Sequence, residues 1–269
     1  MINSIANTKV KNLIQLQKKS KLRKEQGVFV VEGLKMFREA PREWFVSIWA
    51  SEHFFNHHPA LFQELSLFRE IEYHILSDKV FERVSDTKTP QGILSVLKQP
   101  HHKMETFLQT KCPFFLVLEH IQDPGNLGTI LRVAEGAGVT GIFMSSDTVD
   151  IYNPKTIRST MGSVYRMPFL YIEDMRAIMK KFKEQGILSY AAHLEGIQVY
   201  DTPNYRQGTT FLIGNEANGL SDALAEQADV CIRIPMEGQV ESLNVAIATS
   251  ILSYEVYKQR RKAVKHPTS

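Results

Sequence analysis

In the first hundred positions, short continuous runs of apolar residues alternate with segments whose apolar residues are spaced as on one face of a helix. Val10, Leu13, Ile14 and Leu16 fall on one side of a helix expected over about residues 9–24. The run 28–31 lies between two glycines and predicts a buried strand. The alternation continues with helices over 34–39, 58–68 and 78–84 and strands over 45–50, 72–75 and 92–97. This order predicts a small α/β sandwich.

The second half repeats the alternation with strands that are more apolar. The run 114–119 is too apolar to alternate, as expected of a strand covered on both faces. Further strands are expected over 141–144, 189–193, 210–213 and 230–234, and helices over 127–137, 157–163, 175–184 and 245–261. We therefore predict a parallel sheet with helices on both faces. The polar stretch Gln99–Lys103 suggests a linker, so the expected organisation is a domain 1–99, a linker 100–111 and a domain 112–269.

The composition of the chain mainly excludes membrane, secreted and metal-binding proteins. The chain is 43% hydrophobic and 23% charged, which is ordinary for a globular protein. It has no apolar run long enough to cross a membrane and no secretory signal, so we expect a cytoplasmic protein without a membrane partner. Cys112 and Cys231 lie far apart and are expected to be reduced thiols. The pairs His57-His58 and His101-His102 lack further ligands at useful spacing, so no metal site is expected.

The positive charge is concentrated at the N-terminus. Residues 1–24 have no acidic residue and seven basic ones: Lys9, Lys11, Lys18, Lys19, Lys21, Arg23 and Lys24. A solvated helix face is the ordinary explanation of such a run. Basic residues in one segment also suit phosphate contacts, because each neutralised phosphate releases counterions. The distribution indicates that the first half approaches a polyanion.

Three loops in the second half combine glycines with polar side chains, and each follows a predicted strand. The first loop, 123–132, opens a helix; the second, 214–221, has two glycines with an acid between them; the third, 234–246, precedes the last helix. A turn or a helix cap would explain each loop taken alone. Together they lie at the carboxyl ends of parallel strands, where open α/β sheets bind ligands.

The polar and glycine positions of these loops resemble the three signature motifs of the SpoU, or TrmH-like, RNA ribose methyltransferases. The matching stretches are Asn126-x-Gly128-x-x-x-Arg132, Gly214-x-Glu216-x-x-Gly219 and Ser242–Ala246, in the order of the family. The resemblance covers about residues 112–262. The first half is similar to the ribosomal-protein-like RNA-binding domain of rRNA-directed members, on the stretches Phe29–Gly33 and Thr89–Gly92.

The resemblance implies a trefoil knot near the C-terminus, a homodimer and S-adenosylmethionine as the cofactor. The residues that match cofactor-binding positions are Gly214, Ile234, Met236 and Leu243. Those that match the catalytic cluster are Asn126, Arg132, Glu216 and Asn244. Many members have serine where this chain has Ala246, so no hydroxyl role is expected there. The expected substrate is RNA rather than DNA, with 23S rRNA and a guanosine favoured.

Family proposals make the arginine of the first motif the base that removes the 2′-hydroxyl proton. The pKa of a guanidinium exceeds about 12, so neutral arginine is costly. A bidentate grip of Arg132 on a neighbouring phosphate, with Glu216 orienting it, is an equally physical role.

Other classes of function stay open. A tRNA methyltransferase or a non-catalytic protein of RNA binding or ribosome assembly would share this layout. Gly136–Gly141 satisfies the glycine pattern of dinucleotide-binding oxidoreductases, but it follows a helix and precedes a strand, which is the reverse of the required context. Ile247, Ile251, Tyr254 and Tyr257 form an apolar stripe on the last helix. Core packing ordinarily explains such a stripe, whereas the resemblance assigns part of this helix to a dimer interface.

Overall fold

The computed structural model describes the backbone of residues 1–66 and 71–265. It divides into two compact units. Unit 1 consists of Met1–His101 together with Asp150–Tyr165, and unit 2 consists of His102–Val149 together with Arg166–Ser269. The last two positions of the helix predicted over 58–68 lie outside the described residues.

Unit 1 is built on a mixed sheet in the order β1-β4-β2-β3. Strand β4 is antiparallel to both of its neighbours, whereas β2 and β3 are parallel. The strands are β1 (Val28–Glu32), β2 (Phe45–Ser51), β3 (Glu72–Leu76) and β4 (Ile93–Lys98). The helices are α1 (Thr8–Lys18), α2 (Ser20–Gln26), α3 (Leu34–Glu39), α4 (Glu52–His57), α5 (Pro59–Ser66) and α6 (Asp78–Val84), with the 3₁₀ turn η1 (Arg42–Trp44). The four predicted strands are confirmed, and α4 is an additional helix.

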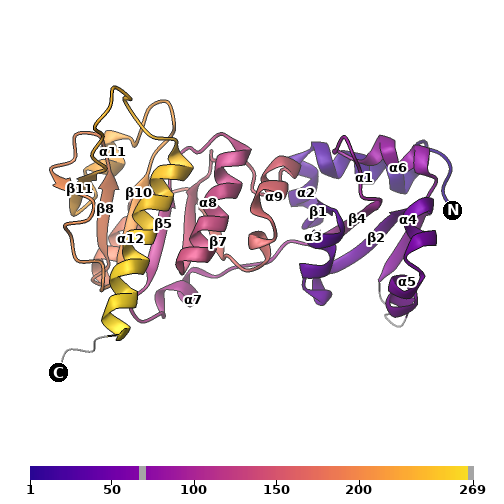
Figure 1. Ribbon diagram of the computed structural model, residues 1–269, viewed down its shortest axis with the longest axis horizontal. Coiled ribbons are helices and arrows are strands. Elements are labelled where there is room, and N and C mark those ends of the chain that lie inside the picture. Colours follow the sequence, from indigo (N-terminus) through magenta and orange to yellow (C-terminus); the bar gives the residue numbers. More distant parts are fainter. Residues whose placement is uncertain (67–70, 266–269) are drawn as a thin grey trace. The chain divides into compact units, whose positions relative to one another are not determined.

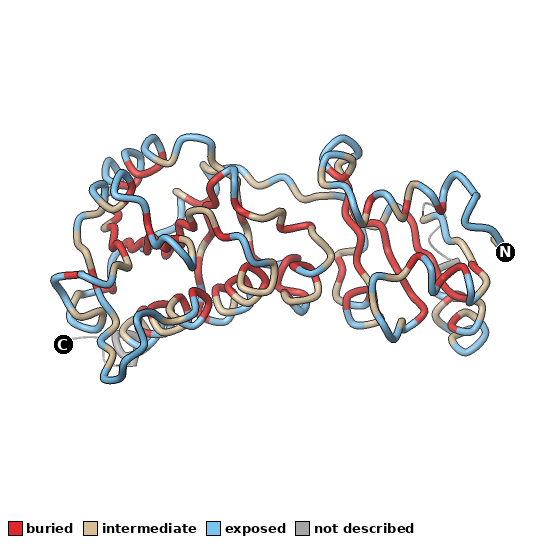
Figure 2. Tube along the Cα trace, turned by 90° about the horizontal axis from the view of Figure 1, so that it is seen from above, coloured by how far each residue is buried: buried red, intermediate tan, exposed pale blue. Residues whose placement is uncertain are grey.

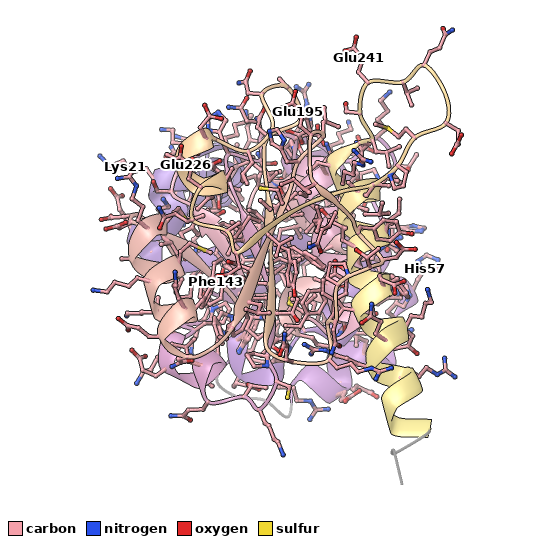
Figure 3. All side chains as sticks on the ribbon, turned by 90° about the vertical axis from the view of Figure 1, so that its left-hand side faces the viewer. Lys21, His57, Phe143, Glu195, Glu226 and Glu241 are labelled. Carbon is pink, nitrogen blue, oxygen red and sulfur yellow. The ribbon has the colours of Figure 1, made fainter. Side chains whose placement is uncertain are left out.

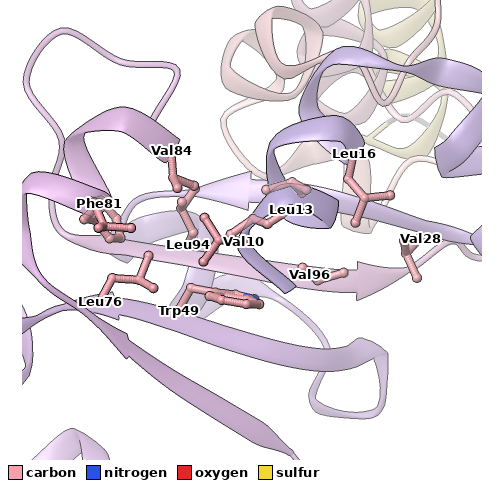
Figure 4. Close-up of a cluster of buried hydrophobic side chains, with 12 residues drawn as sticks. Val10, Leu13, Leu16, Val28, Trp49, Leu76, Phe81, Val84, Leu94 and Val96 are labelled. Carbon is pink, nitrogen blue, oxygen red and sulfur yellow. The ribbon is translucent and has the colours of Figure 1, made fainter. Parts of the chain in front are cut away.

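Two apolar cores cover the faces of this sheet. One core packs the apolar side of α1 and helix α6 on the sheet around Trp49 and Leu76 (Figure 4). The other packs Phe37 of α3, Phe54 of α4 and Phe62 of α5 on the opposite face. The predicted α/β sandwich is therefore confirmed.

The helix expected over residues 9–24 is two helices. Lys19 has extended backbone angles, φ −116° and ψ 108°, and separates α1 from α2. The Arg23 guanidinium donates hydrogen bonds to the carbonyls of Leu16 and Gln17, at 2.6 and 3.1 Å. A side chain therefore satisfies carbonyls in the last turn of α1, where a continuing helix would use backbone N–H groups.

A segment from the middle of the chain completes unit 1. It comprises α9 (Pro154–Thr160) and the 3₁₀ turn η2 (Ser163–Tyr165). Arg23 pairs with Asp150 at 2.5 Å, and the Tyr165 hydroxyl donates to the Met36 carbonyl at 2.8 Å. The segment is thus held by contacts to residues more than a hundred positions away, which no local pattern indicates.

Unit 2 is a seven-stranded sheet in the order β7-β6-β5-β10-β8-β11-β9, and every pair given by the register is parallel. The strands are β5 (Phe114–Leu118), β6 (Gly141–Ser145), β7 (Phe169–Ile172), β8 (Leu188–Ala192), β9 (Gln198–Val199), β10 (Thr209–Ile213) and β11 (Val230–Arg233). The helices are α7 (Met104–Leu108), α8 (Pro124–Ala137), α10 (Met175–Glu184), α11 (Asp222–Ala225) and α12 (Val245–Lys265). The predicted parallel sheet is confirmed, with β7 and β9 as additional strands.

Helices cover both faces of this sheet. Side chains of α7, α10 and α11 share one core with Phe115, Val117 and Phe143 of the sheet. Helices α8 and α12 lie side by side on the other face (Figure 1). All five residues of β5 are completely buried, as its apolar run predicts. In Figure 2 the buried residues gather in the interior of each unit and the exposed ones lie along its outer loops and helices. Residues 104–108 of the expected linker form α7, whose Phe107 is buried against Phe143.

Three of the four residues of the apolar stripe on α12 are exposed, and the fourth, Ile251, is half-buried. Ile247, Tyr254 and Tyr257 are 51%, 47% and 38% exposed, whereas Thr249 and Ser253 on another side of the helix are completely buried. The ordinary explanation of the stripe is therefore wrong for this unit.

The order of strands also requires a long crossing after β11. Strand β11 is separated from β10 by β8, yet α12, the next helix, packs along α8. The segment 234–244 therefore crosses the carboxyl edge of the sheet.

Candidate active site

Hydrogen bonds join the three predicted loops at one edge of the unit 2 sheet. Strands β5 and β10 are parallel neighbours with Leu118 beside Ile213, so their following loops begin at the same edge. The side-chain amide of Asn126 donates to Glu216 Oε1 at 2.8 Å, and its Oδ1 accepts from Asn244 Nδ2 at 2.9 Å. Asn126 thus connects the second loop to the third. We call Asn244, Asn126 and Glu216 the amide–carboxylate chain.

Asn126 is held by the start of α8. Asp123 caps this helix and accepts a hydrogen bond from the Asn126 N–H at 2.8 Å, and Pro124 occupies the first helical position. Pro at that position costs nothing because its missing N–H has no helical partner there. The first turn of α8 therefore fixes where the Asn126 side chain begins.

Arg132 lies apart from this chain of hydrogen bonds. It is on α8 six residues after Asn126, about 9 Å further along the axis at ~1.5 Å per residue. Its side chain is exposed, and within the described part of the protein it makes no hydrogen bond or ion pair. The structure therefore brings together three of the four predicted catalytic residues and leaves this guanidinium open to a partner.

The second loop is a tight turn that only glycine permits. Asn215 and Gly219 exchange two backbone hydrogen bonds of 2.9 Å, and Gly219 has a left-handed φ of 69°. A Cβ on Gly214 would lie 2.1 Å from the backbone of Gly219 and Leu220. The chain's own turn thus explains the glycine at position 214, which the resemblance matches to a cofactor-binding position.

His120 and Asn215 also position the site, and sequence reasoning missed both. The Asn215 side chain donates to the His120 carbonyl at 2.8 Å, which ties the second loop to the end of β5. His120 has a left-handed φ of 58°, and its N–H donates to Ser145 Oγ. Its Nδ1 lies 2.6 Å from Asp147 Oδ2. The hydrogen bonds from Ser145 and His120 lower the pKa of Asp147. An Asn directly after a strand and before a turn was the available signal.

The third loop has the groups that a nucleoside needs. Ile234, Met236 and Leu243 are partly buried, and the loop extends into solvent at Glu241 (Figure 3). Among the described residues, no backbone N–H from 234 to 244 donates to another protein group. Free backbone donors and acceptors beside apolar side chains can pair with the edge of an adenine ring. The third loop therefore has backbone groups and apolar side chains of the kind that a nucleoside cofactor such as S-adenosylmethionine would use.

The N-terminal basic residues differ in availability. Lys9 pairs with Glu72, and Lys21 lies 3.9 Å from Glu25. Arg23 is only 3% exposed and is occupied by Asp150 and two carbonyls, so its predicted contact with RNA is wrong. The exposed lysines without such pairs in the described residues are Lys11, Lys18, Lys19 and Lys24.

Other kinds of site are not supported. Gly138 ends α8 and Gly141 begins β6, so the glycine pattern there is a helix-to-strand turn. The described residues contain no group of three or more His, Cys, Asp or Glu that could hold a metal ion. No helix in that part of the chain is long and apolar enough to cross a membrane.

A parallel sheet whose carboxyl edge holds polar residues and free backbone groups is typical of an α/β protein that binds a ligand at that edge. Known proteins define it further. Residues 113–254 match the SpoU rRNA Methylase family, and residues 7–95 match the MRM3-like substrate binding domain. The chain belongs to the SpoU family and is an S-adenosylmethionine-dependent RNA 2′-O-ribose methyltransferase.

Individual relatives match over nearly the whole chain. An uncharacterized tRNA/rRNA methyltransferase of Synechocystis is 33% identical, covering 96% of this chain and 94% of that protein. The Bacillus subtilis 23S rRNA (guanosine(2553)-2′-O)-methyltransferase RlmP is 31% identical, covering 95% and 98%. The crystal structure of an AdoMet-bound rRNA methyltransferase from Sinorhizobium meliloti has a TM-score of 0.85 at 29% identity, covering 96% and 97%.

Proposed function

We propose that this enzyme methylates a ribose of 23S rRNA, at a guanosine. The observation that carries the catalytic part is the amide–carboxylate chain, which draws one residue from each of the three loops to one place. The choice of RNA is supported by the Bacillus relative that acts on a 23S rRNA guanosine. Residues 7–95 match a substrate-binding domain, which supports a large RNA substrate that is also contacted outside the active site.

In the proposed reaction a C–O bond forms at the ribose 2′-oxygen as a C–S bond breaks, and the hydroxyl proton is lost. S-adenosylmethionine supplies an electrophilic methyl group on a sulfonium, so the protein's main task is orientation. Backbone groups near Gly214, Ile234, Met236 and Leu243 would hold the cofactor. Asn126 and Asn244 would fix Glu216 beside the 2′-hydroxyl. As a charged guanidinium, the exposed Arg132 would grip the adjacent phosphate and the hydroxyl proton would pass to water; only a neutral Arg132 could accept that proton.

We also propose that the enzyme is a homodimer through the exposed stripe of α12. Ile247, Tyr254 and Tyr257 leave large apolar surfaces in water on one helix, which is typical of an interaction face. Tyr254→Arg is expected to give a monomeric mass by light scattering. Tyr73→Arg changes a tyrosine of similar exposure, 45%, in unit 1 and should leave the dimer intact. A monomeric parent protein at micromolar concentration would contradict the proposal.

The test is transfer of labelled methyl from S-adenosylmethionine to unmodified 23S rRNA and, in parallel, to bulk tRNA. Alkali-resistant dinucleotides in 23S rRNA would support ribose methylation there, and their composition would identify the base. Label in tRNA alone would favour the alternative of a tRNA methyltransferase. Cofactor binding without transfer to either RNA would contradict both substrates, and absence of cofactor binding would favour a non-catalytic RNA-binding protein.

A further inference from the structure

Unit 1 has a hollow that the proposed reaction does not use. It has a volume of about 810 Å³, within the roughly 300–1,000 Å³ of small-molecule sites, and lies among α3, α4 and the residues before β4. The side chains that carry chemistry there are Lys35, Arg38, Glu39, His53, His57 and His58.

The stretch Thr89–Gly92 and the start of α3, which directly follows the stretch Phe29–Gly33, shape this hollow. Gln91 Oε1 accepts the backbone N–H of Leu34 at 2.8 Å, which joins the start of α3 to the loop before β4. Gly92 has a φ of 85°, and a Cβ there would lie 2.7 Å from the Cβ of Phe54. The close approach at Gly92 brings α4, with its histidines, against that loop.

Hydrogen bonds and ring contacts fix the positions of the histidine rings. The His58 ring stacks on Phe54 with centroids 4.0 Å apart and an interplanar angle of 16°, and His57 lies 4.1 Å from His53. His57 and His58 direct Nδ1 to the carbonyls of His53 and Phe54, at 2.8 and 3.0 Å. His53 and His57 are exposed, so these fixed rings are open to a flat partner (Figure 3 labels His57).

Cations lie on the α3 side of the same hollow. Arg38 is exposed and, among the described residues, has no hydrogen bond or ion pair. Lys35 is 3.7 Å from Glu39, the one acid among the residues that line the hollow. Flat rings beside a free cation are the combination that binds unpaired RNA, where bases stack on rings and phosphates pair with cations.

We propose that this hollow binds an unpaired nucleotide of the RNA substrate, with its base against His57 and its phosphate at Arg38. The site lies outside the lysines of α1 and α2 and rests on the proposed function only for the identity of the RNA. A double helix would leave the rings without a base, because its bases are stacked inside. An acidic peptide would use the cations alone.

The test measures binding of a short fluorescein-labelled oligoadenylate to the full chain by anisotropy, at one fixed low salt concentration. His57→Ala and Arg38→Ala are each expected to weaken binding roughly tenfold, the scale of one stacked base. His57→Phe keeps a flat ring and should bind like the parent. His101→Ala and Arg83→Ala change exposed residues of the same types in unit 1, outside the hollow, and should have no effect.

Several results would overturn the proposal. The first is a parent protein that does not bind the labelled oligoadenylate, and the second is equal affinity of the hollow and control variants. The proposal also fails if His57→Phe binds as weakly as His57→Ala, or if polyglutamate displaces the labelled oligoadenylate as effectively as the unlabelled one does. Thermal melts check that each variant is folded, and Arg38→Ala carries the test if the His57 variants are not. Methylation of 23S rRNA is measured alongside. An unchanged KM for 23S rRNA in the hollow variants would refute the site alone. If the hollow variants bind the oligonucleotide more weakly but the parent protein methylates no RNA, only the proposed function is refuted.

Discussion

Replacing Asn126 with aspartate tests the amide–carboxylate chain most directly. The change keeps the acceptor for Asn244 and removes the donor for Glu216, leaving two carboxylates where a 2.8 Å hydrogen bond was. A hydrogen bond to a charged group contributes about 1.5–3 kcal/mol, and the exposure of Glu216 favours the lower end. Repulsion of two charges at ~4 Å in water adds about 1 kcal/mol. A total of about 2–3 kcal/mol corresponds to roughly 30- to 150-fold fewer molecules with Glu216 in place.

We therefore expect Asn126→Asp to lower single-turnover methyl transfer about 30- to 150-fold without loss of cofactor binding. Stability should change little, because an acid in the first turn of α8 interacts favourably with the helix dipole. Transfer is measured with labelled S-adenosylmethionine, cofactor binding by calorimetry and stability by thermal melting. Asn218→Asp is the matched control, since it adds the same charge to an exposed asparagine of the second loop.

A second background separates this effect from a general loss. In Glu216→Gln, an aspartate at position 126 can accept from the glutamine amide, so the repulsion disappears. The cost of Asn126→Asp should be smaller there than in the parent, with a coupling of at least ~1 kcal/mol. Equal costs in both backgrounds, or parent-like transfer in Asn126→Asp, would refute the role given to the hydrogen bond.

Three further predictions follow from the same structure. Arg132→Ala should abolish methyl transfer and leave the cofactor affinity within about twofold, because its exposed side chain holds nothing in the fold; normal turnover would contradict this. Gly214→Ala should abolish cofactor binding, measured by calorimetry, because the new Cβ would lie 2.1 Å from backbone atoms of the turn. A Cβ at Gly238 would meet no atom within 4 Å, so the Gly238→Ala protein should bind the cofactor normally. Arg23→Met should destabilise unit 1 by about 3–5 kcal/mol in denaturant titrations, because it leaves Asp150 without its buried partner; the same loss in Lys24→Met would refute this cause.

The positions of the catalytic loops could be predicted from the sequence because they depend on local patterns. The runs 114–119 and 210–213 are apolar or β-branched enough to indicate buried strands, and parallel strands have their carboxyl ends at one edge. Gly214 follows β10 directly, and Asn126 lies in the first turn of α8, the helix that follows β5. What the pattern did not contain was the order of strands, so the direct hydrogen bond between Asn126 and Glu216 had to come from the structure.

Other features depend on distant contacts or on weak signals. The break at Lys19 is accompanied by a guanidinium held by Asp150, which is 127 residues beyond Arg23. Strand β9 has only two residues, too few to show a period. Periodicity found the apolar stripe of α12 but not the side that packs inward. Thr249 can be buried there because its hydroxyl donates to the Val245 carbonyl within the helix, at 2.7 Å.

Because Asp150–Tyr165 form part of unit 1, a single cut of the chain cannot separate the two units into intact fragments. The chain enters this segment after β6 and leaves it before β7, so the polypeptide passes between the two units three times. A cut near residue 100 would leave the methyltransferase part with an appendage whose Tyr152 and Ile157 have lost the surface that buries them. We expect such a fragment to aggregate unless the appendage is replaced by a short polar turn. Recombination between relatives would need to exchange both pieces of unit 1 together.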